Sequence, residues 1–211
     1  MDKKTITKVK SVLFKLGLVA ISIGIAYWYG TFHPNNHTLV NISKQFEDDN
    51  LRALKEIGFK EPDFIYNDRK SFIVAVSKCM DYINFTLEKE KRIPRSMVVA
   101  MAIIESADGT SRFAVEGNNL FGIRTWNDNI PQLKPRGIPN AKFGVKKFDS
   151  KCESVGEVIS ILNRHPAYEK FRTARTNKKD VNSMIDGITA WSTNDQYIII
   201  IKQTILDNKL L

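Results

Sequence analysis

The fold is decided by the stretch Met97-Val98-Val99-Ala100-Met101-Ala102-Ile103-Ile104-Glu105, an uninterrupted apolar run that ends in a carboxylate. As a helix, this run places Val98, Met101 and Glu105 on one face, at positions i, i+3 and i+7. An acid in line with buried side chains resists ionisation, because loss of water disfavours its charged form. A carboxyl group that stays protonated near neutral pH is suited to general acid catalysis. Position alone also allows a plainer interpretation, in which Glu105 is the first solvated residue beyond a core helix.

Outward from this run, apolar residues recur at helical spacing in four further segments. They are residues 43–57, residues 67–89, a segment from about residue 155 with Ser150 or Ser154 as its cap, and residues 197–206. Residues 118–139 are rich in Asn, Asp, Pro and Gly and indicate loops between short extended pieces, and residues 142–149 alternate loosely enough to form a strand. This order predicts an α+β fold in which helices dominate and the β region is small.

The N-terminus has the pattern of a membrane segment. Four lysines precede residues 12–29, an apolar stretch whose only charge is Lys15, and aromatic residues Tyr27-Trp28-Tyr29 end it. We expect residues 1–30 to form a basic cytoplasmic tip and an N-terminal transmembrane helix that acts as a signal anchor. A cleaved signal peptide with a cut before Tyr27 is the alternative. Either interpretation exports the rest of the chain, in which residues 31–66 are expected to be a connector with a short helix.

Charge and cysteine content exclude several classes of function. The net charge is +9, of which the first 30 residues supply +4, and the remaining +5 is interpreted as spread along the chain. There is no dense basic tract interleaved with aromatic residues, so we expect no nucleic-acid partner. Three histidines show no metal-ligand spacing, so we expect no metal and no cofactor. Cys79 and Cys152 could form a disulfide in an exported domain, but a buried free thiol is the more usual state for Cys79.

Glu105 begins a longer motif, Glu105-Ser106-Ala107-Asp108-Gly109-Thr110-Ser111-Arg112-Phe113-Ala114, which is followed by Gly117-Asn118-Asn119-Leu120-Phe121-Gly122-Ile123. Together the two blocks resemble the signature of the glucosaminidase family of peptidoglycan hydrolases, and within it the Bax-like branch. The resemblance continues in Phe148-Asp149-Ser150 and Asn163-Arg164-His165-Pro166-Ala167-Tyr168 and covers roughly residues 69–206. It implies a lysozyme-like catalytic domain over residues 67–211, with a substrate cleft beside a small β region.

The resemblance also implies roles for individual residues. Glu105 would be the general acid that protonates the departing glycosidic oxygen. Gly109 would allow a tight turn after the helix. Substrate-binding residues would be Ser106, Asn119, Leu120, Phe121, Gly122 and Tyr197, although Phe121 could equally belong to the core.

The chain departs from the family pattern at two places. Ala107-Asp108 stands where the family often has Gly-Trp, and Asp108 would either face the cleft beside Glu105 or lie solvated on the surface. Near the C-terminus the usual tyrosine position is altered, and Trp191 or Tyr197 could line the cleft instead. The possible second carboxylate is Asp128. The open mechanisms are water activation by Asp128 or Asp149, assistance by the 2-acetamido group of the substrate, and Glu105 acting alone with positioned water.

The expected function is therefore a peptidoglycan hydrolase of the endo-β-N-acetylglucosaminidase type, held in the bacterial inner membrane by a single span with its catalytic domain in the periplasm. Its expected partners are peptidoglycan glycan strands and the inner membrane. A protein partner is also possible, but no feature of the sequence identifies it. The alternatives are a lytic transglycosylase or muramidase that uses the same acid, and a catalytically inert peptidoglycan-binding scaffold.

Overall fold

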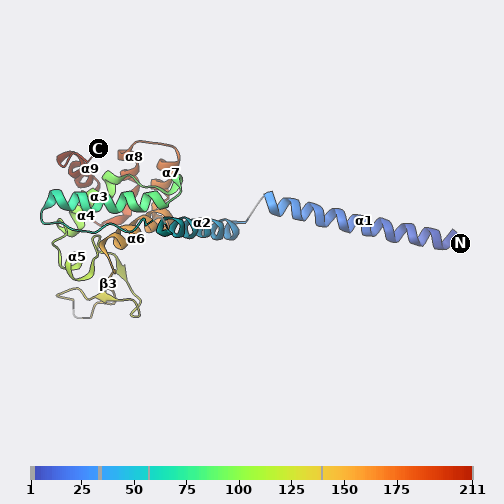
Figure 1. Ribbon diagram of the computed structural model, residues 1–211, viewed down its shortest axis with the longest axis horizontal. Helices are drawn as coiled ribbons and strands as arrows, with labels where there is room; N and C mark the ends of the chain where they lie inside the picture. Colours follow the sequence, from blue (N-terminus) through green and yellow to red (C-terminus); the bar gives the residue numbers. More distant parts are fainter. Residues whose placement is uncertain (1–2, 33–34, 57, 139, 211) are drawn as a thin grey trace. The chain divides into compact units, whose positions relative to one another are not determined.

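The computed structural model describes residues 3–32, 35–56, 58–138 and 140–210 (Figure 1). The chain divides into two compact units, Met1–Ala53 and Leu54–Leu211.

The N-terminal unit is helical. Helix α1 spans Lys3–Phe32, and its part Lys8–Phe32 has a mean hydropathy of 1.9 and no buried residues. This helix is long and apolar enough to cross a membrane, a test that a signal sequence would also pass.

Helix α2 spans Asn36–Glu56, so the helix of the connector is longer than the segment at residues 43–57 that the sequence predicted. The side chain of Asn35 accepts a hydrogen bond from the Thr38 backbone N–H at 2.8 Å, which caps the helix seven residues before the predicted start at Ser43. Ile57, the predicted last residue of this helix, lies outside the described residues.

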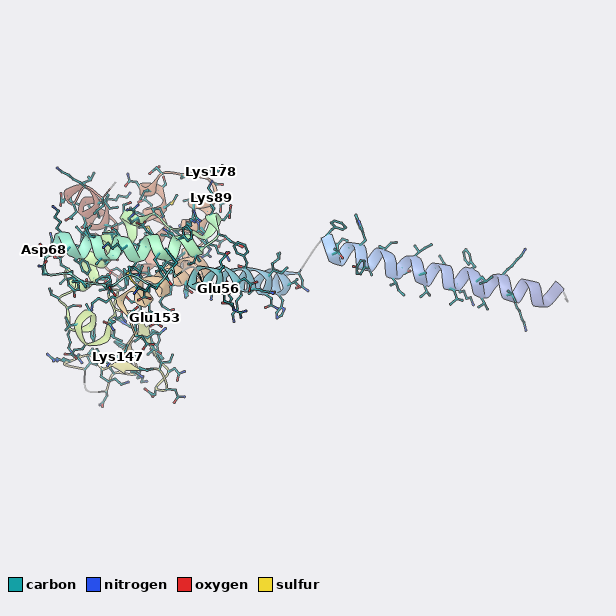
Figure 2. The ribbon with its side chains drawn as sticks, viewed as in Figure 1. Glu56, Asp68, Lys89, Lys147, Glu153 and Lys178 are labelled. Carbon is teal, nitrogen blue, oxygen red and sulfur yellow. A yellow bond between two sulfur atoms is a disulfide. The ribbon has the colours of Figure 1, made fainter. Side chains whose placement is uncertain are left out.

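The second unit is predominantly helical, as predicted. Its helices are α3 (Arg69–Thr86), η1 (Lys89–Lys91), α4 (Arg95–Ser106), α5 (Arg112–Gly117), α6 (Lys151–Arg164), η2 (Pro166–Tyr168), α7 (Glu169–Thr176), α8 (Val181–Ile185), η3 (Asp186–Trp191) and α9 (Tyr197–Asp207). Side-chain caps at three starts explain these boundaries: Asp68 caps α3, Ser150 caps α6 and Asp180 caps α8. Figure 2 labels Asp68 at the beginning of α3. Next to the α6 cap, the Asp149 backbone N–H donates to the Glu153 carboxylate at 2.8 Å.

The core is built around α4, which packs against α3 and α9. Its residues 97–102 are each 1% exposed or less, so the helix is buried on all sides and not on one face as the spacing had suggested. Helix α9 confirms the helical spacing at residues 197–206. It buries one face, through Tyr197, Ile201 and Ile205, and leaves Ile199 60% exposed.

The β region is a small antiparallel sheet in the order β1-β3-β2. Its strands are β1 (Arg124–Thr125), β2 (Gln132–Leu133) and β3 (Gly144–Lys146), and β3 confirms the strand predicted within residues 142–149. Arg124 pairs with Val145, and Gln132 pairs with Lys146. With α5, the sheet forms a small lobe, defined here as residues 112–147, beside the helices of this unit (Figure 1).

Cys79 and Cys152 form a disulfide that joins α3 to α6, with their Cα atoms 5.2 Å apart. The expectation of a buried free thiol at Cys79 is therefore wrong, although both residues are buried as expected. Sequence spacing could not reveal the pair, because 73 residues separate the two cysteines and only the packing of α3 on α6 brings them together.

Candidate active site

Helix α4 ends in an unusual turn directly after Glu105. Three successive residues, Ala107, Asp108 and Gly109, have positive φ angles of 50°, 57° and 79°. The turn reverses the chain so that the Ser111 N–H reaches the Ser106 carbonyl at 2.9 Å. Left-handed conformations at non-glycine residues cost about 1–2 kcal/mol each, so contacts from elsewhere in the unit must hold them in place.

Three side chains hold this turn. Arg69 from α3 donates from its Nε and Nη2 atoms to both carboxylate oxygens of Asp108, at 2.7 to 3.0 Å. The Tyr66 hydroxyl donates to the Gly109 carbonyl at 2.7 Å. The Ser106 hydroxyl accepts the Gly109 N–H at 2.7 Å. The sequence suggested that Asp108 either faces the cleft beside Glu105 or lies solvated on the surface. Instead, its carboxylate forms a bidentate ion pair with Arg69, a type of contact with strong geometric specificity.

Gly109→Ala is expected to destabilise the second unit by about 2–3 kcal/mol, because an added Cβ meets both strain and contact. The position has φ of 79°, and the Cβ would lie 2.7 Å from Phe72 and 2.8 Å from Tyr66. Denaturant unfolding measures the loss. Gly137→Ala is the matched control, since Gly137 has φ of 80° with no atom within 4 Å of the added carbon. Equal losses of unfolding free energy in Gly109→Ala and Gly137→Ala would show that the contacts of Phe72 and Tyr66 add nothing to the cost of the substitution.

Glu105 projects from the last turn of α4 into a half-buried position flanked by aromatic side chains. Trp191, the last residue of η3, donates its indole N–H to the Glu105 Oε1 atom at 3.2 Å. Behind the indole, the Tyr168 ring of η2 lies with its centroid 6.1 Å from that of Trp191. Segments 60 to 90 residues apart in the sequence therefore meet around one carboxyl group.

Tyr197, the first residue of α9, lies beside the same carboxyl group. Its side chain is 4% exposed, and its buried hydroxyl has no hydrogen bond of regular geometry among the described residues. Burial raises the pKa of Tyr197, and the charge of Glu105 raises it further. The Tyr197 hydroxyl is therefore a close electrostatic neighbour of Glu105 and not its hydrogen-bonded partner.

Burial raises the pKa of the Glu105 carboxyl above its ordinary value, and the polar hydrogens of Tyr197 and Trp191 offset part of that rise. No other carboxylate of the described residues is among the groups that act on this pKa. Loss of solvent, and not repulsion from a second acid, is therefore what favours the protonated form.

Trp191→Phe is expected to raise the pKa of Glu105 further, because it removes a donor that stabilises the ionised carboxylate. If Glu105 must be protonated for activity, the alkaline limb of the pH–rate profile moves to higher pH. Profiles of kcat/KM for the two proteins measure this shift. Asp128→Asn serves as the control and should leave the limb in place. If the alkaline limb moved to lower pH in Trp191→Phe, the Trp191 N–H would not be a donor that stabilises the ionised Glu105 carboxylate.

Several residues predicted to bind substrate are buried. Ser106 and Leu120 are 0% exposed, Asn119 is 1% exposed and Phe121 is 3% exposed. Both hydrogen bonds of the Ser106 hydroxyl go to backbone groups, at Ala102 and Gly109. These side chains therefore support the site, in place of the direct contact with substrate that the sequence suggested.

Asn119 shows what this support consists of. Its amide nitrogen donates to the carbonyls of Ile123 and Lys146, at 3.0 and 2.8 Å, and its amide oxygen accepts the N–H groups of Phe121 and Ile123. All of its hydrogen-bonding capacity is used to fasten the loop to β3. Gly122 has φ of 64° and, of residues 119–122, is the one that retains partial exposure.

Asp128, the candidate second carboxylate, lies in the turn between β1 and β2. Its side chain is 88% exposed and pairs with Lys134 at 3.4 Å. A solvated carboxylate of this kind lacks the buried setting in which Glu105 lies. Sequence reasoning missed Arg69 and Tyr66, which meet the site only through tertiary packing. It gave no role to Tyr168, although that residue lies in the motif at residues 163–168.

Comparison with known families accounts for this arrangement. The glucosaminidase family model, described as mannosyl-glycoprotein endo-beta-N-acetylglucosaminidase, matches residues 84–210. The chain belongs to the glucosaminidase family. Membership confirms the resemblance: the second unit carries a glycoside hydrolase domain of the glucosaminidase family. Tyr66 and Arg69, which hold the turn after Glu105, lie before the matched region, so the folded unit extends beyond it.

Individual relatives of this glucosaminidase support the same conclusion. It is 35% identical over 116 residues to the protein named bax of Escherichia coli K12, which covers 52% of this chain and 40% of the relative. It is 22% identical over 149 residues to the peptidoglycan hydrolase FlgJ of the same strain, which covers 64% of this chain and 45% of the relative. The matches thus span less than half of either relative, and the first supports the Bax-like branch.

The catalytic domain of the autolysin Auto from Listeria monocytogenes shares the fold, with a TM-score of 0.55 and 22% identity. The match covers 79% of this chain and 94% of that domain. It confirms the predicted lysozyme-like, mainly helical fold of the glucosaminidase.

Proposed function

We propose that the chain is a membrane-anchored peptidoglycan hydrolase that cleaves the glycan backbone as an N-acetylglucosaminidase, with Glu105 as its general acid. The observation that carries this proposal is the setting of Glu105: a single carboxyl group at the end of a buried helix, with its pKa raised by burial and one of its oxygens 3.2 Å from the Trp191 indole nitrogen. This setting favours the protonated form of the carboxyl group, which is the form that a general acid needs.

In the first step, the Glu105 carboxyl gives its proton to the oxygen that leaves with the departing sugar, and the glycosidic bond to C1 breaks. The resulting carboxylate is stabilised in place by the Trp191 N–H. The hydroxyl of Tyr197 also faces this negative charge, and the aromatic walls limit the access of water.

When the glycosidic bond breaks, C1 becomes electron-deficient, and a second group must stabilise it or bond to it. Asp128 is exposed and paired with Lys134, and no described carboxylate acts on the pKa of Glu105. We therefore favour assistance by the substrate, in which the carbonyl oxygen of the 2-acetamido group bonds to C1 as the leaving group departs. The Glu105 carboxylate then takes a proton from water, and that water opens the cyclic intermediate and leaves a reducing N-acetylglucosamine.

The proposed location is the periplasmic side of a bacterial inner membrane, with α1 as a single-pass anchor. Lysines precede the apolar span and support a cytoplasmic N-terminus. The buried Cys79–Cys152 disulfide supports an oxidising compartment for the second unit, because such bonds persist outside the cytosol. The proposed partners are peptidoglycan strands and the inner membrane.

Digestion of purified sacculi by the full chain in detergent tests this function, with mass spectrometry of the new chain ends. New reducing ends that are N-acetylglucosamine are expected. Reducing N-acetylmuramic acid ends would identify a muramidase, and 1,6-anhydro ends would identify a lytic transglycosylase. Sacculus binding without any release of product, in folded protein, would identify an inert scaffold.

A further inference from the structure

Beyond the first 30 residues, the net positive charge of this protein lies in the small lobe. Residues 112–147 contain seven Lys or Arg and two Asp or Glu residues, for a formal charge of +5. The whole chain carries +9 and its first 30 residues carry +4, so the remainder is formally neutral. The interpretation of the charge as spread along the chain is therefore wrong. Figure 2 labels Lys147 on this lobe.

The two acids of the small lobe are already engaged by its own basic side chains. Glu116 contacts Arg112 at 3.0 Å and Arg136 at 3.8 Å. Asp128 contacts Lys134 at 3.4 Å. Lys146 pairs with Glu157 of α6 at 3.3 Å. Among the described residues of the lobe, no further carboxylate offsets the charge of Arg124, Lys142 and Lys147, and clustered positive charge of this kind attracts anionic polymers.

An aromatic platform lies in the same lobe, on the ladder between β1 and β3. Arg124 pairs with Val145 in that ladder, so the next position on the same face brings Trp126 across from Phe143. The two ring centroids are 6.2 Å apart, and the Arg124 guanidinium lies 4.4 Å from the centre of the Phe143 ring. Trp126 is 69% exposed, and in the described part of the chain no carboxylate pairs with Arg124.

The lobe that carries this platform is joined to α6 of the same unit. Lys146 of β3 pairs with Glu157 at 3.3 Å, and the Leu120 N–H donates to the Ser154 hydroxyl at 3.4 Å. An exposed indole offers a flat apolar surface to a pyranose ring, and an arginine already held against an aromatic ring can bind a carboxylate at little entropic cost.

We propose that the platform of Arg124, Trp126 and Phe143, with the adjacent exposed Lys142, is a second binding site for peptide-bearing peptidoglycan. Trp126 takes the face of a sugar ring, and Arg124 and Lys142 take a carboxylate of the stem peptide. This inference rests on the proposed function and narrows its substrate class to glycan strands that carry anionic peptides.

Binding of the full chain to sacculi tests the platform, with Glu105→Gln in every protein so that the substrate is not consumed. We expect Arg124→Gln/Lys142→Gln and Trp126→Ala each to weaken binding about tenfold at low salt in a co-sedimentation assay. The loss in the double variant should shrink at high salt, and the loss in Trp126→Ala should persist. Lys178→Gln/Lys179→Gln removes the same charge from exposed positions outside the lobe and should bind within twofold of the parent. Equal melting temperatures establish that all variants are folded.

Chemically altered sacculi test the carboxylate directly. Coupling the stem-peptide carboxyls to methylamine removes their charge and should weaken binding, whereas coupling them to taurine replaces each carboxylate with a sulfonate and should restore it. Equal binding to untreated and methylamine-coupled sacculi would overturn the proposal, as would platform variants that bind like the lysine control.

A membrane partner would give a different result. In nanodiscs of brominated anionic lipid, quenching of Trp126 fluorescence, measured against Trp126→Ala, together with unchanged sacculus binding would place the platform on lipid and overturn the proposal. A failure of the proposed function would look different. In that case the platform variants would lose binding as expected, but the protein that retains Glu105 would release no new chain ends from sacculi.

Discussion

Glu105→Gln is expected to lower kcat/KM on sacculi by about 10²–10⁴-fold, because the amide keeps the shape of the side chain but has no acidic proton to give. Release of soluble fragments from sacculi measures the loss. Glu169→Gln is the control, since Glu169 is exposed and lies on α7. Its activity should match that of the unchanged protein. A Glu105→Gln variant that retains a tenth of the activity or more would contradict the role of this acid.

The same substitution should increase stability near neutral pH. Burial raises the pKa of Glu105 in the folded state, so the folded state holds a proton that the unfolded state loses as pH rises above the ordinary glutamate value. Stability therefore falls across the window between the ordinary pKa and the raised one. Glutamine does not titrate and avoids this loss. The melting temperatures of the two proteins should differ at neutral pH and converge below pH of about 4.

Removal of the disulfide is expected to have the largest effect on stability. Cys79→Ala/Cys152→Ala opens a loop of 73 residues, and the chain-entropy model gives a cost of about 4 kcal/mol for a loop of this length. The melting temperature of the second unit should fall by about 8–16 °C. Reductant added to the unchanged protein should produce most of the same fall once the bond is opened, and it should not affect the variant. An unchanged melting temperature in the variant would show that the bond contributes no stability.

The sequence was most informative where local patterns decide the structure. The apolar run before Glu105 predicted a core helix, the family motif implied a tight turn at Gly109, and Ser150 was one of two predicted caps for α6. These features depend on residues within one or two turns of one another, so local sequence patterns can reveal them.

Features that depend on tertiary contact could not be predicted in this way. The Arg69–Asp108 ion pair spans 39 residues, and the Trp191–Glu105 hydrogen bond spans 86. The sequence named Trp191 as a possible cleft residue but could not identify its partner. For Asn119, Leu120 and Phe121 the sequence suggested too much. The family motif implied that they contact the substrate, but their side chains are buried.

Direct titration of the Glu105 carboxyl is the measurement that tests the proposed chemistry most closely. Carbon-13 NMR of protein labelled at glutamate side chains, with Glu105→Gln to assign the signal, gives its pKa, and the pH dependence of kcat/KM gives the alkaline limb of activity. We predict a pKa above the ordinary glutamate range that coincides with that limb. An ordinary pKa, or activity that persists at pH values where Glu105 is fully ionised, would contradict its role as the proton donor.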